Sequence, residues 1–175
     1  MPGDLNTIVF NKAKSKKGKS VELYQVINCW SFVESMLRKS GAMTSNDYMT
    51  REELANPDAD YQWGEISKIK TISAAKPGDI IQLNKYAVTC SVVKLPEKPG
   101  TYEYGDVPTM PHHSAIVHTA LRNGKIKVMH QNWQGVKKVV MTDLIVKDGI
   151  YKEGELEVDC KVQGDITVYP PEKRF

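Results

Sequence analysis

Hydrophobic positions in the first part of the chain recur with a helical spacing. Residues 28–40 carry apolar side chains three or four positions apart, which predicts a helix. Asn28 is a suitable N-cap for this helix, and Gly41 is a suitable C-terminal stop. A second, shorter helix is expected to begin near Thr50 and to end at Asn56.

Beyond residue 72, apolar and polar residues alternate, which is the spacing of strands with one buried face. Strands are expected at residues 80–83, 86–94, 114–121, 125–132, 136–141, 156–162 and 166–169. The segment 95–111 contains four prolines and two glycines and is expected to be a long surface loop. One helical region before an antiparallel sheet predicts a single α+β domain over residues 1–175, with an N-terminal helix packed on the sheet.

The strongest turn signal is Asn123-Gly124, which predicts a two-residue hairpin turn. In the resulting register, Val117 lies opposite His130, and Ala115 lies opposite Asn132. Because side chains alternate along a strand, all four of these residues are expected on one face of the hairpin.

All four histidines of the chain, His112, His113, His118 and His130, lie in or beside this hairpin. Alternation places His113 on the face of His130 and Asn132, and His118 on the opposite face. His113 is therefore the best candidate for a general base, with Asn132 as a diagonal neighbour and His130 further along. His112 and His118 are expected to be surface or packed residues. A zinc site is not expected, because no Cys or His has zinc-finger spacing.

The three cysteines, Cys29, Cys90 and Cys160, are widely spaced. This odd number predicts free thiols and folding in a reducing compartment rather than a disulfide framework. Cys29 falls in the first turn of the predicted helix, where the helix dipole favours a thiolate. A neighbouring imidazole would make it an ion-pair nucleophile, and the alternative is a small buried hydrophobic residue. Cys90 and Cys160 are expected to be buried structural residues.

The net charge of +3 depends on five lysines between Lys12 and Lys19. They predict a solvated basic loop at residues 11–20 rather than a nucleic-acid site. No apolar stretch approaches the roughly 20 residues of a membrane span. The first residues lack the features of a signal peptide, so synthesis in the cytosol is expected, with any export by a specialised route. No cofactor or metal is expected.

Several short motifs in order along the chain resemble the CHAP family, which belongs with the NlpC-type peptidases in the papain-like superfamily. They are Cys29-Trp30 at a helix start, Pro77-Gly78-Asp79 before a strand, His113-Ser114-Ala115-Ile116-Val117, and His130-Gln131-Asn132-Trp133 at the end of a hairpin. The resemblance covers residues 25–141. It implies a papain-like fold, Cys29 as nucleophile, His113 as base and Asn132 as the family's asparagine.

The chain departs from the family at His130, where CHAP enzymes carry a glutamate. NlpC-type relatives use a histidine as third member, so the orienting role stays open between His130 and Asn132. Gln25, together with the Cys29 backbone N–H, is a candidate oxyanion donor. Trp30 and Trp133 are candidates for substrate contacts.

The resemblance implies an amide hydrolase of the peptidoglycan amidase or endopeptidase class, of secreted-effector or lysin type. Peptidoglycan or another amide-containing molecule would be its substrate, and an inhibitor (immunity) protein would be a further partner. The segments 44–63 and 95–111 could line the cleft or be plain surface insertions. The rival interpretation is a non-catalytic or protein-directed module, similar to the cysteine-proteinase-like domain that ends fungal cortical actin adaptors.

Overall fold

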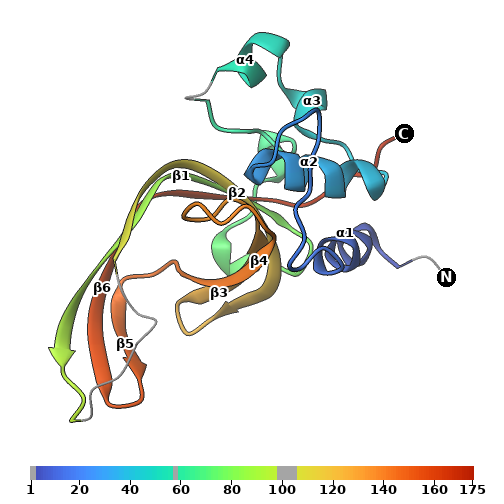
Figure 1. Ribbon diagram of the computed structural model, residues 1–175. Helices are drawn as coiled ribbons and strands as arrows, with labels where there is room; N and C mark the ends of the chain where they lie inside the picture. Colours follow the sequence, from blue (N-terminus) through green and yellow to red (C-terminus); the bar gives the residue numbers. More distant parts are fainter. Residues whose placement is uncertain (1–2, 57–58, 98–105) are drawn as a thin grey trace.

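The computed structural model describes residues 3–56, 59–97 and 106–175 (Figure 1). Its helices are α1 (Leu5–Lys14), α2 (Cys29–Lys39), α3 (Ser45–Tyr48) and α4 (Arg51–Ala55), with 3-10 turns η1 (Ile66–Lys68) and η2 (Ile72–Ala74). Its strands are β1 (Ile80–Lys94), β2 (Val107–Arg122), β3 (Lys125–His130), β4 (Val140–Ile145), β5 (Gly149–Glu153) and β6 (Leu156–Tyr169).

The six strands form one antiparallel sheet in the order β4-β3-β2-β1-β6-β5 (Figure 1). The sheet curls into a half-barrel. Tyr86 of β1 donates a hydrogen bond of 2.8 Å to the carbonyl of Ile145, at the end of the edge strand β4. This contact joins strands that are not neighbours, so it spans the concave face.

Two hydrophobic clusters fill the two faces of the sheet. Ile81, Ala115, Val117 and Trp133 belong to the cluster of the concave face. The other cluster joins α1 and α2 to the convex face, through Phe32, Val33, Met36, Leu37, Ile80, Ile116 and Met129. The predicted helix after Asn28 is confirmed: the Asn28 side chain accepts from Ser31 N–H, and the Ser31 hydroxyl accepts from Asn28 N–H.

The expected fold class, an α+β papain-like domain with an N-terminal catalytic helix on a sheet, is wrong. The structure is mostly an antiparallel β half-barrel, with 44% of residues in strands and 22% in few, short helices. The first helix is α1, not the helix that carries Cys29. The sequence pattern underestimated the sheet because long, bent strands were interpreted as pairs of short ones.

Strand β1 shows why the strands were divided. Its hydrophobic pattern breaks near Lys85, which has a positive φ of 54°, and the pairing of β1 with β6 shifts there. Gly164 lies on the other side of this bulge with φ 91°, and a Cβ at this position would come 2.4 Å from the Lys85 carbonyl oxygen. Only glycine fits such a site, so the strands bend here without ending.

Two further expectations are corrected by the fold. Cys90 and Cys160 lie opposite each other on β1 and β6 and form a disulfide, so they are not free thiols. The sequence could not predict this pair because 70 residues separate them. The basic loop expected at 11–20 is partly helical, since α1 extends to Lys14 and a turn follows it.

Two further predicted segments border residues outside the described part of the chain. The helix expected from Thr50 is confirmed as α4, but residues 57–58 lie outside the described residues. The loop expected at 95–111 is wrong at its end, because β2 begins at Val107, and residues 98–105 lie outside the described part. Within the described ranges no helix is both long and apolar enough to cross a membrane.

Candidate functional site

The centre of the candidate site is a hydrogen-bonded pair of buried histidines. His113 Nε2 lies 2.9 Å from His130 Nδ1, and His130 Nε2 lies 2.8 Å from the Thr142 hydroxyl. His113 is 2% exposed and His130 is 0% exposed. Trp133 stacks on the His130 ring at 4.7 Å and contacts the His113 ring at 5.1 Å between centroids. The two imidazoles are therefore held by ring packing as well as by hydrogen bonds.

Burial keeps both imidazoles neutral. It lowers the pKa of His113 to about 4. It also lowers the pKa of His130 well below its usual value, and the neighbouring His113 adds to that effect. Two neutral imidazoles can share one hydrogen bond, with one ring donating and the other accepting, whereas two charged rings would repel.

The hairpin register explains why His130 rather than Asn132 meets His113. Bulges between Arg122 and Val117 shift the pairing, so that Val117 lies opposite Val128 and Ile116 opposite Met129. His130 thus comes two residues closer to His113 along β2 than the unbulged hairpin predicts. Because the total shift is two residues, the predicted faces are unchanged.

Asn132 does not orient the base. The chain leaves β3 after His130, and Asn132 has a left-handed backbone with φ 61°. Among the described residues no hydrogen bond joins its side chain to His113. Its expected role as a diagonal neighbour fails because the strand ends two residues before it.

Cys29 begins α2 on the convex side of the sheet, and its thiol contacts Ser114 rather than an imidazole. Ser114 follows His113 in β2, but its side chain points to the opposite face. Pairing of β2 with β3 begins only at Ile116. Ser114 therefore lies before the paired part of β2, where the start of α2 can approach it. Within the described residues there is no hydrogen bond between Cys29 and His113.

The expected ion pair is therefore absent, and the surroundings of Cys29 explain it. Burial is the largest influence and raises the pKa of the thiol, although part of the residue is exposed. Hydrogen bonds from Ser114 and from the backbone N–H groups of Cys29 and Trp30 favour the thiolate but do not outweigh burial. The helix-terminus effect predicted from the sequence is present, yet the thiol stays protonated near neutral pH.

Gln131 fixes the start of α2 against the end of β3. Its side-chain amide donates to the carbonyls of Val21 and Asn28, both at 2.9 Å, and its carbonyl accepts from Val21 N–H at 2.6 Å. Sequence reasoning missed this residue although it stands between His130 and Asn132. It sets where Cys29 lies relative to the hairpin.

Three aromatic residues surround the thiol on the convex side. Tyr61 contacts the rings of Trp30 and Trp63, and the Cys29 charge contributes to raising the pKa of Tyr61 after burial. Trp30 donates to Ser45 at 3.0 Å and stays partly exposed. Trp30 is thus placed beside Cys29, as a substrate contact would be, whereas the other predicted contact, Trp133, packs on the histidines.

Gln25, the candidate oxyanion donor, lies in an exposed turn between Leu23 and Val26 with φ 64°. The described structure gives its side chain no hydrogen bond to Cys29. The groups that donate hydrogen bonds to the thiol are the backbone N–H groups at the start of α2, the Ser114 N–H and the Ser114 side chain.

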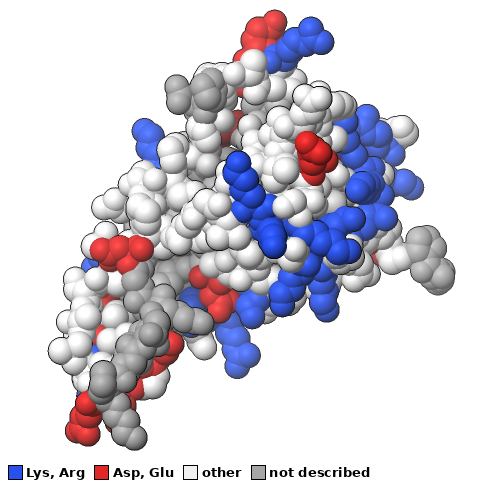
Figure 2. Space-filling view, viewed as in Figure 1, with Lys and Arg blue, Asp and Glu red and all other residues white. Residues whose placement is uncertain are grey.

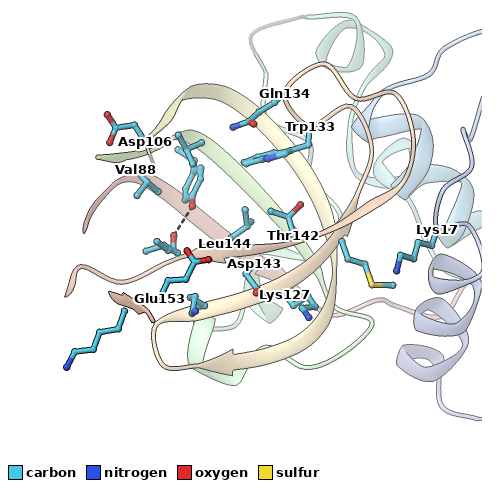
Figure 3. Close-up of a pocket in the computed structure, with 16 residues that line it drawn as sticks. Lys17, Val88, Asp106, Lys127, Trp133, Gln134, Thr142, Asp143, Leu144 and Glu153 are labelled. Carbon is cyan, nitrogen blue, oxygen red and sulfur yellow. Dashed lines mark hydrogen bonds between the residues drawn. The ribbon is translucent and has the colours of Figure 1, made fainter. Parts of the chain in front are cut away.

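A groove of about 830 Å³ adjoins the histidine pair at the open side of the half-barrel (Figure 3). It is lined by β4 and β5 residues together with Trp133, and both Trp133 and Thr142 face it. Charged side chains of both signs surround it, including Lys127, Asp106 and Asp143. Neither the two histidines nor Cys29 belongs to its lining, so the groove adjoins the histidine pair only through Trp133 and Thr142.

The remaining histidines lie outside this site. His118 contacts the Phe10 ring at 5.3 Å on the convex side, as alternation predicts. His112 is half-buried and is not part of the His113–His130 pair. No group of three or more His, Cys, Asp or Glu side chains that could hold a metal occurs in residues 3–56, 59–97 and 106–175.

Comparison of the chain with protein-family models, with curated proteins and with solved structures found no match. The chemistry proposed below therefore depends on the arrangement of Cys29, His113, His130 and Thr142, together with the resemblance of the short motifs.

Proposed function

We propose that the protein is a cysteine amide hydrolase in which Cys29 is the nucleophile, His113 the base and His130 the residue that orients the base. The observation that carries the proposal is the 2.9 Å contact between His113 Nε2 and His130 Nδ1. A histidine base in hydrolases of this kind uses one ring nitrogen for the nucleophile and the other for an orienting partner. With Nε2 occupied, Nδ1 of His113 is left for the thiol.

The hydrogen-bond chain supports the required tautomer. If His113 Nε2–H donates to His130 Nδ1, then His130 Nε2–H donates to the Thr142 hydroxyl, and both hydrogen bonds are satisfied. His113 Nδ1 is then unprotonated and can accept a proton. The reverse chain, with Thr142 donating, would protonate Nδ1 and block the reaction.

The reaction proceeds from a neutral thiol and a neutral imidazole. Cys29 turns from Ser114 toward His113 Nδ1, which takes the thiol proton as Sγ attacks the amide carbonyl. The tetrahedral oxyanion faces the backbone N–H groups at the start of α2. The C–N bond then breaks, His113 gives its proton to the leaving amine, and water attacks the thioester with His113 again as base. The motif resemblance favours peptidoglycan as the source of this amide.

A second candidate function is a non-catalytic binding module. It is favoured by the position of Cys29, whose thiol contacts Ser114 and has a raised pKa. In that case the histidine pair and Trp133 would only hold the hairpin end against β4. The groove beside them would then be the binding site.

Hydrolysis of purified peptidoglycan, with the products read by mass spectrometry, tests the first candidate against the second. The wild-type protein is expected to release fragments, and Cys29→Ala and His113→Gln are expected to abolish release while remaining folded by circular dichroism. His112→Gln is the matched control, because it changes a histidine outside the imidazole pair. Equal release by Cys29→Ala would refute the thiol mechanism, and no release by any protein would favour the binding module.

A further inference from the structure

Lysines from three distant parts of the sequence gather on one side of the molecule. The turn after α1 lies along the start of β4: Lys17 forms a parallel bridge with Val139, and Gly18 N–H donates to the Val139 carbonyl. Ser20 donates to the carbonyl of Lys137. These contacts bring the N-terminal lysine run beside Lys137 and Lys138. Figure 2 shows Lys and Arg over the side where α1 lies, and Asp and Glu near the ends of β5 and β6.

His118 lies within this basic surface. Burial lowers its pKa, and the charges of Lys127, Lys14 and Lys17 lower it further, so lysines from β3, α1 and the following turn lie near one ring. Lys14 also lies 5.8 Å from the centroid of the Phe10 ring, which contacts His118. The lysine surface is defined here as Lys14, Lys17, Lys19, Lys127, Lys137 and Lys138.

No carboxylate neutralises this surface. Among the described residues, none of its six lysines forms an ion pair, whereas Lys68, Lys70 and Lys152 elsewhere each do. Lys127 has Asp143 as its partner across β3 and β4, but the two do not form a salt bridge. Like charges held together without partners cost stability, and an anionic partner would remove that cost.

We propose that the lysine surface docks the protein onto a membrane carrying anionic phospholipids. The surface combines lysine point charges with the half-exposed apolar side chain of Val136, which adjoins Lys137 and suits the headgroup boundary. Its six lysines include no arginine fork, which is the group that most often reads guanine in nucleic acids. The proposal does not depend on the chemistry of Cys29.

Sedimentation with lipid vesicles tests the proposal, using vesicles of neutral phosphatidylcholine with and without phosphatidylserine. We expect binding only with phosphatidylserine, and weaker binding as salt rises. Replacing Lys14, Lys17 and Lys127 by Gln should lower the partition coefficient by about 100-fold, since each lysine near such a surface contributes roughly 5-fold.

The matched control replaces Lys68, Lys152 and Lys161 by Gln, which changes the net charge equally away from the lysine surface. It should bind nearly as well as the wild type, and both triple variants should remain folded by circular dichroism. Equal loss in the two variants, absence of binding at low salt, or preference for duplex DNA over the vesicles would each overturn the proposal. Cys29→Ala should bind vesicles as the wild type does. The membrane-docking proposal can therefore fail or hold independently of the proposed hydrolase.

Discussion

Acid should destabilise this protein well above the pH at which carboxylates protonate, because of the buried histidine pair. The pKa of His113 is about 4 in the folded protein, against 6.5 for an unperturbed imidazole. As the pH falls below 6.5, the unfolded state binds a proton that the folded state does not, so folding becomes less favourable. Above that pH neither state is protonated at His113, and the penalty is absent.

The size of this destabilisation follows from the pH interval between the unfolded and folded pKa values of His113. One pH unit corresponds to about 1.4 kcal/mol, so the window from 6.5 to about 4 is worth roughly 3 kcal/mol in total. About 2 kcal/mol of it is lost between pH 7.5 and pH 5, where carboxylates remain ionised. His130 acts in the same direction because its pKa is also lowered.

Urea denaturation at pH 7.5 and at pH 5 measures this loss. Between pH 7.5 and pH 5, the free energy of unfolding of the wild type should fall by about 2 kcal/mol or more. In His113→Gln this fall should be smaller by about 2 kcal/mol. His112→Gln is the matched control, because it changes the neighbouring residue and leaves the imidazole pair in place. A wild-type protein equally stable at both pH values would refute the burial of neutral histidines.

Three further predictions test the site and the fold. Thr142→Val leaves His130 Nε2 without its partner and should cost about 1–3 kcal/mol in urea denaturation, with recovery in Thr142→Ser; an unchanged midpoint in the valine variant would contradict the hydrogen-bond chain. Alkylation of Cys29 by iodoacetamide should be slow at pH 7 and should accelerate steadily toward pH 9, because burial raises the thiol pKa; a rate that is already maximal at pH 6 would instead reveal an ion pair. The Cys90–Cys160 disulfide closes a loop of 70 residues, so its reduction should lower the free energy of unfolding by about 4 kcal/mol. The Cys90→Ser and Cys160→Ser double variant should show the same loss. Equal stability with and without reductant would show that the bond contributes nothing.

The candidate site was predictable in its parts but not in its geometry. The faces of His113, His118 and His130 were predicted correctly, because a strand keeps its alternation when bulges shift it by two positions. The face of Asn132 was not, because the chain leaves β3 after His130. The partner of His113 was not predictable, because the two-residue shift of the β2–β3 register brings His130 to the position predicted for Asn132. Thr142 carried no signal at all, since only the pairing of β3 with β4 brings it to His130.

The sequence by itself determined the local features: the capped start of α2 at Cys29, the Asn123-Gly124 turn and the alternating faces of the hairpin. Each depends on neighbours a few residues apart, and propensity and capping act over that range. The tertiary structure decided the half-barrel, the Cys90–Cys160 disulfide and the contact of the Cys29 thiol with Ser114. These depend on bulges and on contacts between distant segments, whose free energy comes from packing rather than from any local pattern.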